Sequence, residues 1–302
     1  YRKQLPGGAV IGESWEISDR PGDVSVITNG PLAGKDLHWL VENHRVELLG
    51  DAKLEAGRFP LLIKLLDARD VLSLQVHPPA HKAAELHGDP KTEMWFIAEA
   101  DPGAQLHVGL KRGITRADFE HRIQDGTVAE CFHRVPVRAG DAMFLPSGRV
   151  HAIGAGLVIF EIQQNSDTTY RVFDWNRVGL DGKPRELHVA QSLASIDFND
   201  FEPALANGEE IVTPSFRSRL LVNHSLFRVE QFTVHSREAI ELRGSRMQIL
   251  GVVSGQLRVN DPASGEPGPV LRAGEFCLLP AALPAVKLLG EPGTQFLRTA
   301  AG

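Results

Sequence analysis

The chain has 302 residues, with 32 Lys and Arg against 38 Asp and Glu, so its formal net charge is −6. This balance, without a block of basic residues, excludes the charge pattern of a nucleic-acid-binding protein. Hydrophobic residues make up 42% and charged residues 23%, which predicts a packed core and excludes wholesale disorder.

The sequence also limits the expected environment of the protein. It contains no apolar run of about 18 residues and no signal-peptide pattern, so we expect no membrane partner and a cytoplasmic location. The two cysteines, Cys131 and Cys277, lie in apolar stretches and predict buried free thiols in a reducing compartment.

Short strands separated by glycine and proline dominate the chain, and few segments have helical spacing. Apolar residues three and four apart predict a helix over Lys35–Asn43, and we expect another short helix at Pro79–Leu86. Thr115–Asp118 resembles a capping box, which predicts a helix that ends near Gly126. Residues 181–213 are polar and rich in turn residues, so we interpret them as a connector, part of which can be helical.

Two segments carry alternating polar side chains on a predicted strand. Gln75 and His77 alternate within an apolar stretch, so their side chains leave one face of the strand. Glu161, Gln163 and Asn165 alternate in the same way further along the chain. Side chains that share a strand face can line one cavity or form part of a barrel wall.

The stretch Gly140–His151 reads G-x5-P-x-G-x2-H and is similar to the second sequence motif of the cupin β-barrels. Its first glycine predicts a turn, the apolar residues that follow predict a strand, and Pro-x-Gly predicts a second turn. The histidine then enters the next strand facing inward. An imidazole that points into a small barrel is a ready metal ligand.

The chain also contains an internal repeat, because Val137–Pro146 aligns without gaps with Leu271–Pro280. Self-similarity of this kind indicates two copies of one fold. The sequence therefore predicts a mainly β protein of two jelly-roll-like cupin β-barrels with a few short helices. We expect the catalytic barrel with the metal site in residues 1–195 and the second barrel in residues 196–302.

The two copies differ where chemistry is expected. Ala285 stands in the second copy where the first has His151, and an alignment of Met94 with Met247 places Arg246 opposite Glu93. The second copy therefore lacks metal ligands, and one metal site is predicted.

Four residues of the first copy form the candidate metal site. They are Gln75, His77, Glu93 and His151. Two imidazoles, one carboxylate and one amide oxygen, without a thiolate, suit a catalytic Zn²⁺, one per chain. On ligand chemistry alone, Fe²⁺, Mn²⁺ and Co²⁺ remain alternatives.

Five stretches, in the same order, resemble the zinc-dependent mannose-6-phosphate isomerases of type I in their short bacterial form. They are Ile11–Ser18, Ser73–Pro78, Lys91–Trp95, Pro146–Ala152 and Gln163–Trp175. The resemblance implies that the four candidate ligands bind zinc. It also implies that Arg171 is the active-site arginine and that Lys91 contacts the substrate.

The resemblance further implies a reaction and a substrate class. The reaction is the reversible interconversion of mannose 6-phosphate and fructose 6-phosphate through a cis-enediol, so the expected partner is a small sugar phosphate. An aldose–ketose isomerase needs a polarised carbonyl and a positive charge beside the developing enediolate, which a metal and Arg171 would supply. The sequence carries no signal for the oligomeric state.

Several roles stay open at this point. The base can be a metal-bound water, Lys91 with a lowered pKa, or a carboxylate such as Glu161. Arg171 can instead form an ion pair with Asp167 or Asp174. The candidates for binding the phosphate are Lys91, Arg149 and Arg171.

Two other functions fit a protein with this metal-ligand pattern. One is an Fe²⁺-dependent cupin dioxygenase, against which Gln75 argues because it replaces one histidine of a three-histidine site. The other is a non-catalytic sugar-binding or regulatory bicupin, which the loss of ligands in the second copy favours. The four ligands, Lys91 and Arg171 argue against that second alternative.

Overall fold

The computed structural model describes residues 1, 3, 7–8, 10–179 and 182–302. The chain forms two compact units. The middle unit comprises Ile11–Ser14 and Lys64–Leu205, and the flanking unit comprises Tyr1–Val10, Trp15–Ile63 and Ala206–Gly302.

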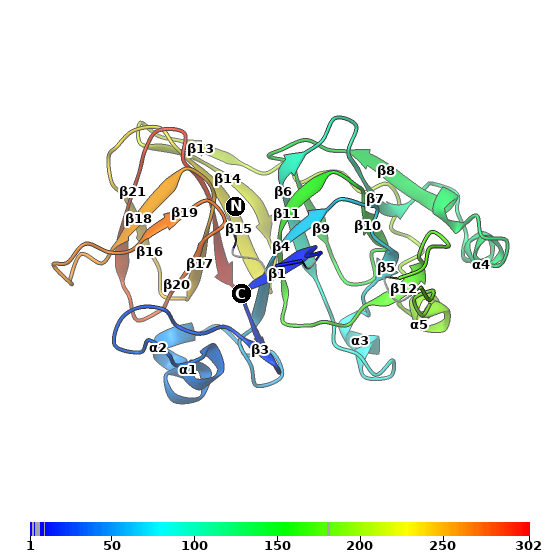
Figure 1. Ribbon diagram of the computed structural model, residues 1–302, viewed down its shortest axis with the longest axis horizontal. Coiled ribbons are helices and arrows are strands. Elements are labelled where there is room, and N and C mark those ends of the chain that lie inside the picture. The colour runs from blue at the N-terminus through cyan, green and yellow to red at the C-terminus, as the bar shows by residue number, and fades with distance from the viewer. Residues whose placement is uncertain (2, 4–6, 9, 180–181) are drawn as a thin grey trace. The chain divides into compact units, whose positions relative to one another are not determined.

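The middle unit is built around two five-stranded sheets (Figure 1). The first sheet has the strand order β1-β4-β11-β6-β9, and the second has the order β12-β5-β10-β7-β8. The strands are β1 (Glu13–Ile17), β4 (Leu61–Ala68), β5 (Leu74–Val76), β6 (Glu93–Ala100), β7 (Gln105–Leu110), β8 (Phe132–Pro136), β9 (Ala142–Leu145), β10 (His151–Ile153), β11 (Leu157–Gln164) and β12 (Tyr170–Phe173). The helices are α3 (Ala80–Ala83), α4 (Arg116–Gln124), the short 3₁₀ helix η1 (Val128–Cys131) and α5 (Val189–Ser195).

The core of the middle unit lies between its two sheets. Trp95, Met143 and Ile159 from the first sheet pack in one buried cluster with Leu106 and Val108 from the second. Burying a large apolar side chain stabilises a fold by about 1.5–3 kcal/mol. The alternation of these side chains along their strands decides which of their neighbours also face the space between the sheets.

The second sheet buries its other face as well, against helices. Leu74 and Val76 of β5 pack there with Phe119 of α4 and Phe132 of β8. Because Leu74 and Val76 face the helices, Gln75 between them faces the space between the sheets. The sequence pattern of β5 therefore assigns its polar residue to the interior.

His107 is a buried histidine on the helix-covered face of the second sheet. It alternates with Leu106 and Val108, is 4% exposed, and lies with its ring centroid 5.6 Å from that of Trp175. Burial, together with the nearby charge of Arg134, lowers the pKa of His107 to about 4. The residue is therefore neutral across most of the pH range in which the fold is stable.

The flanking unit has a six-stranded sheet with the order β13-β14-β15-β22-β17-β20, a four-stranded sheet with the order β16-β21-β18-β19, and the pair β2-β3. Its first elements are β2 (Asp19–Arg20), β3 (Asp23–Val24), α1 (Leu37–Asn43) and α2 (Arg45–Leu49). Its remaining strands are β13 (Glu210–Val212), β14 (Phe216–Asn223), β15 (Phe227–Val234), β16 (Ile240–Arg243), β17 (Gln248–Ser254), β18 (Gln256–Asn260), β19 (Val270–Arg272), β20 (Phe276–Leu279), β21 (Ala285–Gly290) and β22 (Gln295–Ala301).

The same strand plan occurs twice along the chain. The orders β4-β11-β6-β9 and β5-β10-β7-β8 of the middle unit reappear as β15-β22-β17-β20 and β16-β21-β18-β19 in the flanking unit. Each set contains consecutive strands of the chain, β4 to β11 and β15 to β22. The internal repeat read from the sequence is therefore present in the backbone.

The strand register corrects one detail of that repeat. Glu93 pairs with Leu145, and Gln248 pairs with Leu279, which is the repeat equivalent of Leu145. Gln248, and not Arg246, is therefore the equivalent of Glu93. The alignment of Met94 with Met247 was wrong by two residues, a shift that keeps the same side chains facing inward and so leaves the apolar pattern unchanged.

Most of the local sequence signals correspond to elements of the structure. Asp36 caps α1, Thr115 caps α4 in a capping box with Asp118, and the expected helix after Pro79 is the short α3. Within the predicted connector, Asp181 lies outside the described residues, and the remainder includes α5 and β13. Both cysteines are free thiols as predicted, and Cys131 is buried, whereas Cys277 is only half-buried.

The described α-helices have between 4 and 9 residues. None of them combines the length and the apolar character that a bilayer crossing requires.

We expect Phe119→Ala to lower the free energy of unfolding by about 3–5 kcal/mol, because it leaves a cavity where α4 meets the second sheet. Phe119 is fully buried, and its ring lies 5.9 Å from that of Phe132 and 5.7 Å from that of Phe198. Chemical denaturation measures the loss. His121→Ala, on the exposed side of the same helix, is the control and should change stability by less than about 0.5 kcal/mol. Equal stabilities of the two variants would contradict the packing role of Phe119.

We expect His107→Gln to weaken the loss of stability on acidification. The unfolded chain protonates this histidine near pH 6.5, whereas the folded chain does so only near pH 4. The wild type therefore loses stability as the pH falls from 6.5 towards 4, by up to about 3 kcal/mol for this residue alone. Denaturation curves at pH 7 and pH 4.5 give the change in the free energy of unfolding for the wild type and for the variant. An equal change in both proteins would show that His107 does not contribute to the acid sensitivity.

Candidate metal centre

Three of the residues predicted for the site form one row across the second sheet. Arg171 on β12 pairs with Gln75 on β5, and Gln75 pairs with His151 on β10. Paired residues on neighbouring strands point to the same side of a sheet. Because Leu74 and Val76 face the helices, the whole row faces the space between the sheets.

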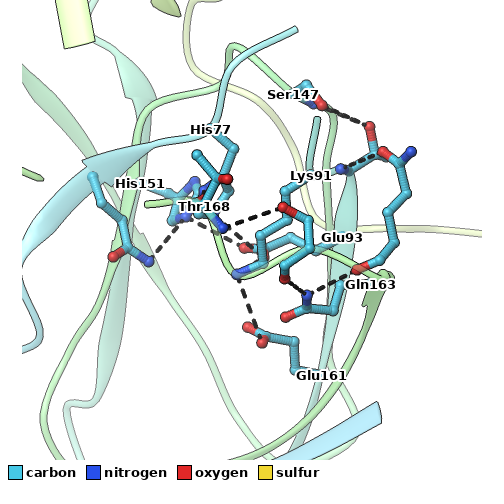
Figure 2. A network of polar contacts seen from close by, with 12 residues as sticks. His77, Lys91, Glu93, Ser147, His151, Glu161, Gln163 and Thr168 are labelled. Carbon is cyan, nitrogen blue, oxygen red and sulfur yellow. Dashed lines mark hydrogen bonds and ion pairs between the residues drawn. The ribbon is translucent and has the colours of Figure 1, made fainter. Parts of the chain in front are cut away.

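The first sheet contributes Glu93, the first residue of β6. Glu93 is fully buried and alternates with Trp95 and Ile97 of the interior cluster, so it also points between the sheets. His77 lies just after β5 and is 1% exposed. His77, Glu93 and His151 each offer a ligand atom, and these atoms all lie within 4.8 Å of one another (Figure 2).

Backbone carbonyl groups orient both imidazole rings. The Nδ1 atom of His77 lies 2.7 Å from the carbonyl oxygen of Thr168, and the Nδ1 atom of His151 lies 2.9 Å from that of Arg149. A carbonyl only accepts, so each Nδ1 carries the proton and donates it. Each Nε2 is therefore left with a lone pair, and these atoms lie 3.5 Å and 3.3 Å from the Glu93 carboxylate.

The atoms at the centre of this cluster fit a bound cation. Among the described residues, His77 Nε2 and Glu93 Oε1 are buried without a hydrogen-bond partner, while Glu93 Oε2 lies 3.0 Å from the Lys91 ammonium. Such atoms are costly to bury unless a ligand satisfies them. Two neutral imidazoles and a carboxylate, each presenting lone pairs to one point, are a donor set that suits a divalent metal.

Gln75 lies at the edge of the same point. Its Nε2 atom is 3.4 Å from His151 Nε2. A 180° rotation of the Gln75 amide exchanges its nitrogen and oxygen, so that the oxygen lies beside His151 Nε2. A bound cation would require this orientation. The structure thus brings together all four residues that the sequence marked as metal ligands.

A chain of alternating charges surrounds Glu93. Lys91 Nζ lies 3.0 Å from Glu93 Oε2 and 4.0 Å from Glu161 Oε1, and Lys64 Nζ lies 3.9 Å from the same Glu161 oxygen. Trp95 Nε1 donates to the other Glu161 oxygen at 2.8 Å. Two buried carboxylates are thus compensated by two buried ammonium groups, which a low-dielectric interior requires.

These charges shift the pKa values of the groups that bear them. Burial works against the charge of Lys91, but Glu93 and Glu161 outweigh it and raise the pKa of Lys91. Burial also works against the charge of Glu93, but Lys91, His77 and His151 together hold the pKa of Glu93 well below its ordinary value. Burial dominates at His151, and lowers its pKa to about 3, and it raises the pKa of Glu161. The two histidines therefore stay neutral and able to bind a metal.

The turn that precedes His151 is tied to His77. Gly148 has φ of 94°, a conformation that favours glycine, and its amide donates to the His77 carbonyl at 2.9 Å. A Cβ at this position would lie 3.2 Å from the carbonyl oxygen of Ser195. The second glycine of the G-x5-P-x-G-x2-H motif therefore joins the segments that carry His77 and His151.

The two candidate arginines lie in different surroundings. Arg149 forms a paired contact with Asp200, at 2.8 Å and 2.7 Å, and donates to the carbonyl of Phe144, so its guanidinium is used within the fold. Arg171 shares the row of Gln75, its Nη1 donates to the carbonyl of Glu186 at 2.9 Å, and its Nε is buried without a hydrogen-bond partner among the described residues. Of the two, Arg171 is the one on the metal side of the sheet.

Sequence reasoning missed some residues of this site. Lys64 interrupts the apolar run Leu61–Leu66 of β4, and a lysine isolated in such a run signals a buried, paired charge. The carbonyl groups of Thr168 and Arg149 carried no signal, because a backbone acceptor is independent of residue type.

Comparisons with known proteins place the chain in a family. Residues 5–95 match the family model described as phosphomannose isomerase type I, catalytic domain. A mannose-6-phosphate isomerase of Streptococcus mutans is 35% identical over 289 residues, which cover 93% of this chain and 86% of the relative. The mannose-6-phosphate isomerase ManA of Bacillus subtilis is 35% identical over 285 residues, with 92% and 86% covered.

Solved structures agree with this assignment. The crystal structure of a mannose 6-phosphate isomerase from Bacillus subtilis has a TM-score of 0.85 at 30% identity, and the match covers 95% of this chain and 89% of that one. A zinc-bound mannose 6-phosphate isomerase has a TM-score of 0.73 at 16% identity, covering 96% and 91%, which is a likeness of fold. The chain therefore belongs to the type I mannose-6-phosphate isomerases.

Proposed function

We propose that this protein is a metal-dependent aldose–ketose isomerase that interconverts mannose 6-phosphate and fructose 6-phosphate through a cis-enediol. The observation that carries the proposal is the buried cluster of His77, Glu93 and His151, with unsatisfied ligand atoms beside the charged Lys91. The names of the full-length relatives support the same reaction. The small-molecule partner is a sugar phosphate, and the cytoplasmic location and the lack of nucleic-acid or membrane partners stay predictions.

We also propose that each set of eight strands is a jelly-roll-like cupin barrel. The repeated strand plan supports this reading. Strands β4 to β11 fall within residues 1–195, the proposed catalytic barrel, and β15 to β22 fall within residues 196–302, the proposed second barrel. In the second set Gln248 and Ala285 replace Glu93 and His151, which supports a single metal site.

The proposed cofactor is one Zn²⁺ per chain, held by His77, Glu93 and His151 with the amide oxygen of Gln75. A nitrogen and oxygen donor set of this kind, without thiolate, is typical of catalytic zinc. When bound, the ion supplies a Lewis acid that polarises the carbonyl of the sugar.

The residues around the cluster have separate roles in this proposal. Lys91, kept charged by Glu93 and Glu161, binds a sugar oxygen or the phosphate, and its raised pKa argues against a role as the neutral base. Glu161 is the better candidate for moving the proton between C2 and C1, because burial raises its pKa towards neutrality. Arg171 places a fixed positive charge beside the enediolate.

The geometry favours this function over the two alternatives. The dioxygenase alternative gives Lys91 and Glu161 no role in the reaction. A protein that only binds sugar has no need of a buried cluster of ligand atoms without hydrogen-bond partners, because burying such atoms costs stability. Oxygen uptake and the appearance of fructose 6-phosphate from mannose 6-phosphate separate the three functions in two assays.

We expect Glu93→Gln to lose the metal and, with it, the isomerase activity. The substitution removes the only carboxylate of the ligand cluster and leaves Lys91 without its nearest counter-ion. Metal analysis of freshly purified protein should give one Zn²⁺ per chain for the wild type and a small fraction of that for the variant. The control is Glu99→Gln, an exposed position on the same strand. A variant that keeps full zinc occupancy would refute the proposed ligand set.

We expect Arg171→Ala to lower turnover by roughly 10²–10³-fold while the metal stays bound. The arginine supplies charge to the reacting centre but is not part of the metal cluster. Coupled isomerase assays and metal analysis on the same preparation provide both numbers, with the exposed Arg116→Ala as the control. Near-normal turnover of Arg171→Ala would remove this residue from the mechanism.

A further inference from the structure

Two chain segments follow β12 and contact each other, and the second of them binds Arg171. Residues 174–179 and residues 183–188 run beside each other, with a bridge between Val178 and Pro184 and a hydrogen bond from the Gly179 amide to the Lys183 carbonyl at 2.7 Å. We call these two segments the arginine clasp. The β12 strand from which the clasp starts lies next to β5 and close to α5 (Figure 1).

Three hydrogen bonds join Arg171 to the returning segment of the clasp. Its Nη1 atom donates to the carbonyl of Glu186 at 2.9 Å, its backbone amide donates to Nδ1 of His188 at 3.1 Å, and its carbonyl accepts from the His188 amide at 2.8 Å. The direction of the guanidinium therefore depends on where residues 186–188 lie, and not on β12 alone.

Asp174 joins the two segments. Its carboxylate accepts from Arg177 Nε at 3.0 Å on its own segment and from Arg185 Nε at 2.7 Å on the returning one. The Asp174 side chain is 6% exposed, whereas those of Arg177 and Arg185 are 33% and 42% exposed. Arg185 directly precedes Glu186, so the carboxylate holds the residue next to the one whose carbonyl binds Arg171.

The clasp is anchored to the segment that leads into β5, the strand of Gln75. Trp175 Nε1 donates to the Leu72 carbonyl at 2.9 Å, and Arg177 Nη1 donates to the Val71 carbonyl at 2.6 Å. Trp175 has φ of 56° and Asn176 has φ of 53°. A left-handed conformation is unfavourable for a tryptophan and persists only where surrounding contacts impose it.

We infer that Asp174 is a positioning residue for catalysis, which aims the Arg171 guanidinium at the sugar phosphate by joining the two segments of the clasp. The inference rests on the proposed role of Arg171. Asp174 itself does not touch the substrate in this view. It is neither required for metal binding nor part of the metal cluster.

The test is a double-mutant cycle between Asp174 and Arg171, read as kcat, KM and metal content. Asp174→Asn should lower kcat by about 10–100-fold, because misplacing a catalytic group by about 1 Å costs on that order. The same substitution in the Arg171→Ala background should cause no further loss, because the group it aims is already gone. Zinc per chain should stay at the wild-type value throughout.

Arg185→Ala provides a second route to the same answer from the exposed side of the clasp. It should lower kcat in the same direction as Asp174→Asn, and Arg185→Lys, which keeps the charge, should recover part of the loss. Arg122→Ala removes an arginine of similar exposure, which pairs with Glu130 on the surface, and should leave kcat unchanged.

Three outcomes overturn the inference. Wild-type turnover of both Asp174→Asn and Arg185→Ala shows that the clasp does not aim Arg171. Equal losses of turnover in the wild-type and Arg171→Ala backgrounds show that Asp174 acts independently of Arg171. Normal turnover of Arg171→Ala removes the function of Arg171 itself, and this result is distinct from the other two because it concerns the single arginine variant.

Discussion

The site depends on one buried carboxylate, Glu93. An isolated charge of this kind is very costly in a protein interior, so its presence requires partners. Lys91 at 3.0 Å and the imidazole nitrogens of His77 and His151 at 3.5 Å and 3.3 Å surround it. Lys91 compensates one charge, and the neutral imidazoles, fixed by backbone carbonyls, leave room for a cation. The fold thus leaves buried lone pairs that a divalent metal would satisfy.

The site forms where the two sheets of the middle unit face each other. The second sheet presents Gln75, His151 and Arg171 in one row, and the first presents Glu93. The apolar cluster around Trp95 lies directly beside them, and the Trp95 ring contacts that of His151 edge-on at 5.1 Å. Close packing against this apolar cluster restricts the rotamers of the candidate ligands and keeps the site preorganised.

The second copy of the strand plan shows what distinguishes a metal site from a plain core. Its register places Arg243, Gln248 and Arg298 where the first copy has Gln75, Glu93 and Glu161. Arg298 donates to Gln248 at 2.6 Å and pairs with Glu230, so these polar groups satisfy one another. Because the polar groups of this set already have partners, it presents no equivalent of the unsatisfied cluster around Glu93.

The sequence by itself determined the strand-rich class, the repeat and the capped helices, and it marked four residues as candidate metal ligands. Those features follow from local rules: alternation for Gln75 and His77, turn chemistry for Gly148, and a capping box at Thr115. Periodicity specifies which face of a strand is polar, and it does so without knowledge of the partner strand. It cannot specify register, which is why Arg246 was matched to Glu93 in place of Gln248.

Only the tertiary structure decided which groups meet. The compensation of Glu161 by Lys64 and Lys91, the use of Arg149 by Asp200, and the clasp on Arg171 all join residues far apart in the chain. Contacts of this kind depend on how sheets pack and where loops return, and no local pattern encodes them. The charge states of the site follow from the same packing, because burial and neighbouring charges, and not residue type, set each pKa.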